Sequence, residues 1–207
     1  LLKKMMSELK VGPAYEKTTQ LGPVVNAEHR ESIVKWIEKG VQEGAKLLLD
    51  GRGVCVKGYE KGFYLGPTLF DHVTPEMTVG NREIFGPVLC VKRVKDFEEG
   101  VALMNASEFG NGSVIYTQSG YWAREFARRT HGGQVGINVG IPVAPSVFGF
   151  TGHKNSFFSD LHTMGTDGIR FFTELKTVSA HWFSEEEARE AKVINSWDGM
   201  TILPDRK

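Results

Sequence analysis

The sequence has few residues that could ligate a metal or form disulfides. Two cysteines in 207 residues cannot make a disulfide framework or a zinc site of the usual kind. Six histidines are scattered without the His-x-x-x-His spacing of helical metal sites, so we expect no metal centre. We expect Cys55 and Cys90 to be small buried residues of a protein from a reducing compartment.

The chain also lacks an excess of charge and a long apolar run. Its 25 basic and 25 acidic residues cancel, and no basic block with interleaved aromatics occurs, so we expect no nucleic-acid partner. The longest uncharged stretch, residues 132–152, contains Pro142, Pro145 and several glycines, which exclude a membrane-spanning helix. Residues 1–6 lack the apolar core of a signal peptide. We therefore expect a soluble protein without a membrane partner, in the cytoplasm or, in a eukaryote, the mitochondrial matrix.

What is present fits a globular α/β protein. The hydrophobic content of 41% and charged content of 24% are ordinary, and the length allows one domain or one and a half. The first nine residues read as the end of an amphipathic helix already under way, which predicts further chain upstream. Asn26 is expected to cap a helix with Ile33, Ile37 and Val41 on its buried face, followed by a strand at residues 45–49.

Residues 88–139 carry the clearest pattern. A strand at residues 88–94 precedes a helix capped by Asp96, and a strand at 113–116 precedes a helix opened by Ser119. Phe97, Val101 and Met104 form the apolar stripe of the first helix, and a strand at 134–139 ends the series. This alternation predicts a parallel sheet with right-handed crossovers. No Gly-x-Gly-x-x-Gly motif occurs, so the segment is not itself a standard dinucleotide-binding half.

The segment Glu-Ile-Phe-Gly-Pro-Val at residues 83–88 combines a carboxylate and an aromatic ring before a Gly-Pro turn. In extended chain Glu83 and Phe85 would point to one side, because residues i and i+2 share a face. An acceptor beside an apolar ring suits a sugar diol next to a flat heterocycle. A solvated Glu beside a core Phe is the other interpretation, and the spacing alone leaves both open.

The same hexapeptide resembles the Glu-x-Phe-Gly-Pro signature of the aldehyde dehydrogenase superfamily, and the similarity extends from about residue 9 to residue 183. The resemblance implies that NAD is the cofactor. It also implies that Glu83 holds the hydroxyls of the nicotinamide ribose and that Phe85 packs by the same end of the cofactor. The implied fold is the parallel-sheet, three-layer catalytic domain of that family.

Two further motifs are similar to the branch that oxidises methylmalonate and malonate semialdehydes with NAD and coenzyme A. They are Gly-Ile-Asn-Val-Gly-Ile-Pro-Val at residues 136–143, and Trp182. Residues 150–156 resemble the family's Phe-Gly-Gly-x-Lys-x-Ser loop, although Thr151 replaces a common glycine. The resemblance implies a substrate pocket lined by Phe150, Ile141 and Pro142. Loops after strand carboxyl ends commonly line ligand crevices in open α/β sheets, which favours the same assignment for residues 141 and 142.

The resemblance implies no catalytic residue in this chain. The nucleophilic Cys, oxyanion Asn and general-base Glu of the family are expected upstream of Leu1, and neither Cys55 nor Cys90 has the family's Gly-Gln-x-Cys context. The predicted function is therefore the C-terminal part of an enzyme of valine catabolism, inactive alone. This NAD-dependent, coenzyme A-acylating semialdehyde dehydrogenase would convert its substrates by oxidative decarboxylation to propionyl-CoA or acetyl-CoA. A non-catalytic binding or assembly module, and a non-acylating aldehyde dehydrogenase, are the alternatives.

The resemblance also implies a division of the chain. Residues 1–165 would form the C-terminal part of the catalytic domain, and residues 166–183 a strand that extends the sheet of a neighbouring subunit. Separately, Ser184 and Glu187 suggest a capping box, so we expect residues 184–207 to form a C-terminal helix and tail. We expect a homo-oligomer, a dimer or a tetramer, because strand addition pairs the backbone groups of a sheet edge.

Overall fold

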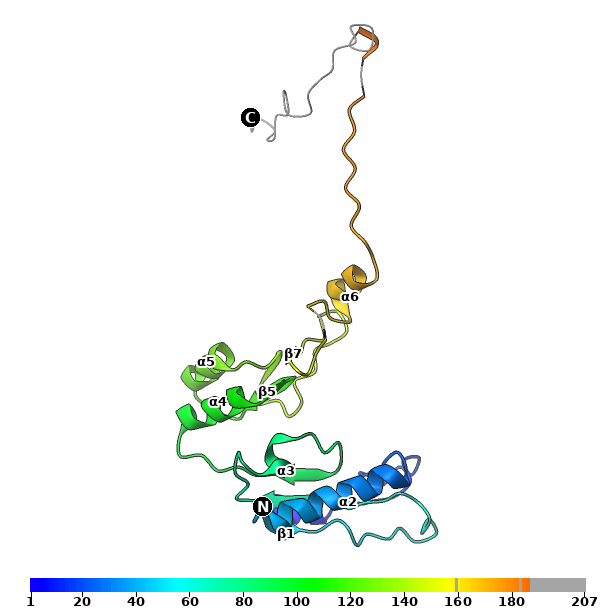
Figure 1. Cartoon of the computed structure of the whole chain (residues 1–207), viewed down its shortest axis with the longest axis vertical. Helices are drawn as coiled ribbons and strands as arrows, with labels where there is room; N and C mark the ends of the chain where they lie inside the picture. The colour runs from blue at the N-terminus through cyan, green and yellow to red at the C-terminus, as the bar shows by residue number, and fades with distance from the viewer. Residues whose placement is uncertain (159, 183, 187–207) are drawn as a thin grey trace. The chain divides into compact units, whose positions relative to one another are not determined.

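The computed structural model describes residues 1–158, 160–182 and 184–186, and the chain divides into two units, residues 1–171 and 172–207. The elements of the first unit are helices and short strands in alternation, which makes the fold mixed α/β as predicted (Figure 1). In chain order they are α1 (Leu2–Ser7), α2 (Ala27–Gln42), β1 (Lys46–Leu49), β2 (Thr68–Asp71), α3 (Thr78–Asn81), β3 (Val88–Cys90), α4 (Phe97–Ala106), β4 (Phe109–Gly110), β5 (Gly112–Ile115), α5 (Gly120–Arg129), β6 (Gln134–Ile137), β7 (His153–Lys154) and α6 (Gly165–Phe171).

Helix α2 and the sheet β1-β2-β3 enclose the main core. The helix begins where predicted, since the Asn26 side chain accepts a hydrogen bond from the His29 backbone N–H at 2.8 Å. Strand β2 pairs antiparallel with β1 and parallel with β3. Val41 is 45% exposed, so the predicted buried stripe of α2 is wrong at its last position. The buried cluster consists of Ile33, Ile37, Ala45, Leu65, Phe70, Val73 and Val79.

A second sheet pairs β5 and β6 in parallel, with α5 as the connection between them. The predicted caps are confirmed here, because Asp96 accepts from the Glu99 N–H at 2.9 Å and Ser119 accepts from the Trp122 N–H at 3.4 Å. Val101 of α4 and Phe126 of α5 are buried, as an apolar face of each helix requires. Figure 1 shows α4 and α5 beside β5.

The expectation of one parallel sheet through residues 88–139 is wrong. Strand β3 ends at Cys90 and pairs with β2, whereas β5 pairs with β6 in a separate sheet among the described residues. The reason lies in the core of α2. Val88 and Cys90 pack against that core, and the Pro87 carbonyl accepts from the Thr68 N–H at 2.8 Å, which places β3 beside the buried strand β2.

The C-terminal segment also differs from the prediction. Residues 166–171 lie in α6 and are helical, so the predicted strand at residues 166–183 is wrong over its first six residues. Residues 172–182 form no helix or strand within this chain and run as an extended segment (Figure 1). Residue 183 and most of the predicted terminal helix fall outside the described residues. Within the described part of the chain, no helix has the length and apolarity needed to cross a membrane.

Candidate functional site

The turn at residues 83–88 alternates in burial, but its backbone does not have the extended conformation expected from the sequence. Ile84 packs against the main core, while Glu83 and Phe85 are exposed, Phe85 by 78%. The backbone is not extended at Phe85, whose φ is 58°. A left-handed conformation costs a residue with a side chain about 1–2 kcal/mol, and such strain concentrates at functional sites.

Helix α2 holds this turn through two of its side chains, those of His29 and Ile33. The His29 Nε2 lies 2.8 Å from the Phe85 carbonyl oxygen, to which it donates. A Cβ on Gly86 would lie 2.6 Å from the Cδ1 of buried Ile33, so only glycine allows this approach. Two consecutive residues of the turn therefore rest on two consecutive turns of one helix.

The far end of α2 anchors the short helix that leads into Glu83. Glu43, at the C-cap of α2, accepts from the Thr78 N–H at 2.7 Å and from the Thr78 hydroxyl. The hydrogen bond from the Thr78 side chain holds the pKa of Glu43 below its ordinary value. The segment before Glu83 is thus fixed at its start by a carboxylate that remains ionised at neutral pH.

Glu83 lies at a pocket of about 590 Å³. Within the described residues its carboxylate has no hydrogen-bond or ion-pair partner, so its acceptor capacity is available. The pocket lies between the end of α3, the end of α4 and the residues at the end of β7 and just after it. Its lining consists of Gly80, Asn81, Arg82, Glu83, Met104, Asn105, Ser107, Phe109, Gly110, Asn111, Gly112, Ser113, Thr130, His131, Gly132, Lys154, Asn155 and Ser156.

The loop after β6 contains the predicted residues Ile141 and Pro142. Asn138 turns the chain there with a φ of 57° and bonds the backbone of Thr117. Ile141 is 75% exposed, whereas Pro142 packs against glycine backbone: a Cβ on Gly112 would lie 3.0 Å from its Cγ. Ile141 is therefore available to a ligand, and Pro142 supports the loop.

The loop containing Phe150 docks on the end of α4 through contacts that the sequence analysis missed. The Lys154 ammonium donates to the carbonyl oxygens of Asn105 and Ser107, both at 2.8 Å. A cation is favourable there because unpaired carbonyls gather at a helix C-terminus. The hydroxyl of Thr151, which replaces a common glycine, donates to the Gly133 carbonyl at 2.5 Å. The Lys of the motif at residues 150–156 was the sequence signal that could have indicated this anchoring contact.

The predicted site residues are only partly brought together. Glu83 lines the 590 Å³ pocket, but Phe85, Phe150, Ile141 and Pro142 are absent from its lining. Phe85 contacts His29 instead, with ring centroids 6.4 Å apart in an edge-to-face arrangement. No grouping of three or more His, Cys, Asp or Glu side chains able to hold a metal occurs in the described part of the chain.

The two cysteines lie in different environments. Cys90 is half-buried, its thiol donates to the Val79 carbonyl at 3.3 Å, and burial raises its pKa. A thiol so held is poorly suited to act as a nucleophile, which requires the thiolate. Cys55 is exposed, so the expectation that it is buried is wrong. It lies at a separate pocket near Arg52 and Tyr59, away from Glu83.

Comparison with protein families gives a match over most of the chain. Residues 1–178 match the profile of the aldehyde dehydrogenase family. A malonate-semialdehyde dehydrogenase of Shouchella clausii is 48% identical over 186 residues, which cover 88% of this chain and 38% of that protein. The malonate-semialdehyde dehydrogenase of Pseudomonas aeruginosa is 47% identical over 174 residues, covering 84% of this chain and 35% of that protein.

Comparison with solved structures finds the same family. A methylmalonate-semialdehyde dehydrogenase from Oceanimonas doudoroffii has a TM-score of 0.86 and 43% identity, covering 89% of this chain and 38% of its own. A Sinorhizobium meliloti protein assigned as a methylmalonate-semialdehyde dehydrogenase, solved with NAD, has a TM-score of 0.86 and 45% identity, covering 88% of this chain and 37% of its own. The chain thus spans less than two-fifths of these relatives' lengths.

Proposed function

The chain belongs to the aldehyde dehydrogenase family, and on that premise we propose that it supplies part of the cofactor and aldehyde sites of a longer enzyme. The proposed enzyme is an NAD-dependent, coenzyme A-acylating dehydrogenase of malonate and methylmalonate semialdehydes. The relatives' names support the substrate class, and the Sinorhizobium meliloti complex supports NAD. Coenzyme A as co-substrate is part of the proposal and follows from the resemblance at residues 136–143.

The observation that carries the proposal is the available carboxylate of Glu83, the first residue of the turn at residues 83–88. A carboxylate offers acceptor positions on both oxygens, which suits the two neighbouring hydroxyls of a ribose. The 590 Å³ pocket beside it has room for a sugar, since small-molecule sites begin at about 300 Å³. Bound NAD would accept a hydride from the aldehyde carbon.

The other predicted site residues of this chain would position the ligands or exclude water from them. Phe85 would pack by the nicotinamide end of the cofactor, and its exposed ring is available for that contact. Phe150 and Ile141 would line the aldehyde pocket, and Pro142 would hold the loop that carries Ile141. Apolar walls at such a site exclude water, which strengthens the interactions of the charged groups inside.

We infer that the nucleophilic thiolate comes from outside this chain. Cys90 is tethered and its pKa is raised, and Cys55 lies at a different pocket from Glu83. In the proposed reaction the thiolate attacks the semialdehyde, hydride leaves to NAD, and a thioester remains. Coenzyme A then takes the acyl group and the enzyme thiolate leaves. The carboxylate β to the thioester is lost as carbon dioxide, and a proton takes its place on the α-carbon, which gives acetyl-CoA or propionyl-CoA.

A test uses the longer enzyme with malonate semialdehyde, NAD and coenzyme A, with NADH and acyl-CoA as readouts. Glu83→Gln keeps the shape of the side chain and removes its charge. Because a hydrogen bond to a charged group contributes about 1.5–3 kcal/mol, we expect kcat/KM for NAD to fall by about ten- to a hundredfold. Glu8→Gln, at an exposed position, is the matched control and should leave the kinetics unchanged.

Three results would contradict the proposal. Glu83→Gln with parental kinetics would show that Glu83 does not hold the ribose. Free acid in place of acyl-CoA would indicate a non-acylating dehydrogenase. Turnover by the 207-residue chain alone, lost on mutation of Cys55 or Cys90, would show that the nucleophile is in this chain.

A further inference from the structure

The first turn of α2 carries a histidine that reaches the strained residue of the turn at residues 83–88. His29 is half-buried, and its Nε2 lies 2.8 Å from the Phe85 carbonyl oxygen. A carbonyl can only accept, so Nε2 carries the proton in this contact. The two rings also meet edge to face, at 60° between their planes. His29 thus contacts both the backbone and the side chain of Phe85.

The geometry of α2 makes this contact rigid. The backbone N–H of His29 donates to the Asn26 side chain at 2.8 Å, so the helix cap fixes the backbone position of His29. Ile33 lies one turn further on the same face of the helix, where its side chain meets Gly86. The peptide plane between Phe85 and Gly86 is therefore held from both of its ends.

We propose that His29 is a positioning residue of the cofactor site: its bond to the Phe85 carbonyl keeps Phe85 in the left-handed conformation that presents the ring to the nicotinamide end of NAD. The inference rests on the proposed function of Phe85. Such a φ is unfavourable for a bulky residue and persists only where the surroundings impose it. The hydrogen bond and ring contact of His29, which lies 56 residues away in sequence, impose this conformation on Phe85.

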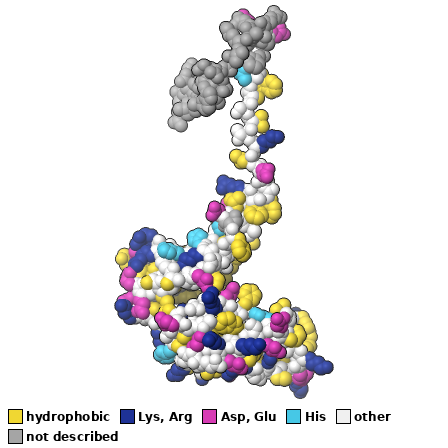
Figure 2. Space-filling model, in the orientation of Figure 1, with side chains coloured by type: hydrophobic (Ala, Val, Ile, Leu, Met, Phe, Trp, Pro, Cys, Tyr) yellow, Lys and Arg dark blue, Asp and Glu magenta, His cyan; other side chains and the backbone are white. Residues whose placement is uncertain are grey.

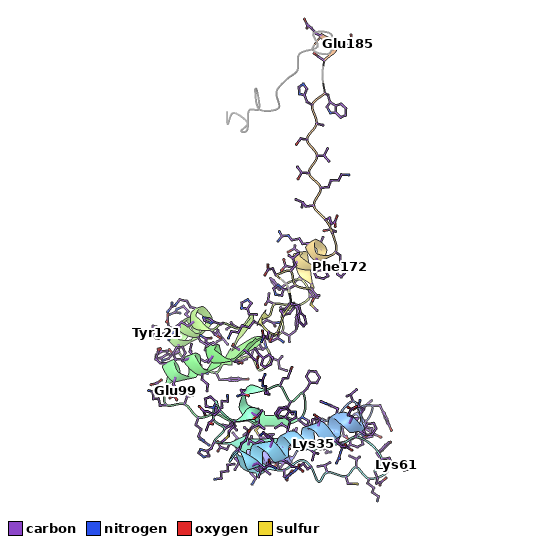
Figure 3. The ribbon with its side chains drawn as sticks, viewed as in Figure 1. Lys35, Lys61, Glu99, Tyr121, Phe172 and Glu185 are labelled. Atoms are coloured by element: carbon purple, nitrogen blue, oxygen red, sulfur yellow. The ribbon has the colours of Figure 1, made fainter. Side chains whose placement is uncertain are left out.

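Three variants of the longer enzyme separate this role from a purely structural one. His29→Leu removes the donor and keeps an apolar side chain, and His29→Gln keeps a donor that can reach the same carbonyl. Lys35→Leu places the same apolar residue elsewhere on α2, at an exposed position (Figure 3). Each variant is characterised by its crystal structure, its thermal unfolding and its KM for NAD and kcat.

In His29→Leu we expect Phe85 to leave the left-handed region and KM for NAD to rise by about three- to tenfold, as expected for loss of one hydrogen bond. Because a displaced ring mis-sets the nicotinamide, kcat should fall as well. His29→Gln should keep Phe85 in place and remain within about twofold of the parent. Lys35→Leu should match the parent. A Leu variant whose Phe85 conformation and kinetics are parental overturns the inference, and so does a Gln variant as impaired as Leu.

The failure of the proposed function would give a different pattern. If Phe85→Ala leaves KM for NAD and kcat unchanged, Phe85 does not serve the cofactor and the assignment of a cofactor role to His29 falls with it. If Phe85→Ala impairs NAD use while His29→Leu does not, the proposed function stands and only the role of His29 is wrong.

Discussion

The backbone pairing of β5 with β6 ends at Ile115 and Ile137. Just beyond that point, the side chain of Asn138 makes two hydrogen bonds that take the place of backbone pairing. Its Oδ1 accepts from the Thr117 N–H and its Nδ2 donates to the Thr117 carbonyl, both at 2.9 Å. Its own backbone is left-handed, a conformation that asparagine tolerates better than most residues. One residue therefore closes the sheet and turns the chain toward Ile141.

Two substitutions at this position should separate the two contributions. Asn138→Gly keeps the backbone freedom and loses both side-chain bonds, so we expect it to lower the free energy of unfolding by about 0.5–2 kcal/mol. Asn138→Ala loses the bonds and also meets the left-handed penalty, so it should cost about 1 kcal/mol more. Urea denaturation measures both. Equal losses for Ala and Gly would mean that the backbone conformation contributes nothing.

Among the described carboxyl groups, Asp71 has the most strongly lowered pKa. It is buried, and Arg93 donates to both of its oxygens, at 2.9 and 2.6 Å, while the His72 N–H donates at 2.8 Å. The Arg93 hydrogen bonds are the main cause that lowers the pKa of Asp71 from 3.8 to about 2. The folded state therefore favours the ionised carboxylate more than the unfolded state does, and this preference stabilises the fold above the ordinary value.

The stabilisation by Asp71 should be complete above pH 3.8 and lost as the pH falls toward about 2. We expect the urea midpoint of the parent to fall across that range and the midpoint of Asp71→Asn, which cannot titrate, to fall less. Asp160→Asn, at an exposed carboxyl, is the control and should follow the parent. Parallel curves for Asp71→Asn and parent would rule out this contribution.

At the scale of elements, side chains of α2 contact the turn at residues 83–88 and hold it in place. His29 and Ile33 contact residues 85 and 86, and Glu43 at the other end bonds Thr78 at the start of α3. The helix also contributes Ile33 and Ile37 to the main core, so apolar burial fixes its position independently of the site contacts.

Gly86→Ala tests this support directly. The new Cβ would lie 2.6 Å from Ile33 Cδ1, closer than packed atoms allow, so we expect a loss of about 1–3 kcal/mol in stability. Gly53→Ala is the control, because no atom of the described chain beyond its neighbours lies within 4 Å of that Cβ position. Removing Cδ1 by Ile33→Val should reduce the cost of Gly86→Ala. An undiminished cost would place the strain elsewhere. Thermal or urea unfolding of Gly86→Ala, Ile33→Val and the variant that combines them measures the coupling.

At the scale of the whole molecule, no charged surface of one sign stands out among the described residues on the face that Figure 2 shows. Lys and Arg side chains are interspersed with Asp and Glu over the face shown in Figure 2, in keeping with 25 of each sign in the sequence. The exposed apolar side chains distinguish the surface more clearly than its charges do. In the extended segment at residues 172–182, Phe172 is 80%, Leu175 99% and Trp182 89% exposed.

We expect this segment to drive self-association, although residues 172–182 form no strand within one copy of the chain. An extended, apolar segment outside any sheet is suited to pair with the edge of a second copy. Light scattering at micromolar concentration should show a dimer or tetramer for the full chain and smaller species for a chain ending at Phe171. A monomeric full chain, or assembly that persists without residues 172–207, would show that the segment has no such role.

Local chemistry alone was enough to predict several elements. Asn26, Asp96 and Ser119 cap the helices at which they were expected, because a cap depends only on a side chain and the next three N–H groups. The parallel pairing of β5 with β6 across a helix also followed from the order of elements, since short right-handed crossovers leave few alternatives.

Long-range contacts decided the rest. His29 meets Phe85 across 56 residues, and Lys154 meets Asn105 across 49, separations that no local pattern reports. The partner of β3 depended on which strand the core of α2 had already buried, and the left-handed Phe85 depended on that helix as well. The sequence by itself therefore determined the helix caps, the crossover and the candidate residues. Only the tertiary structure decided their backbone conformations and partners, because packing against α2 outweighs the local preference of residues 83–90.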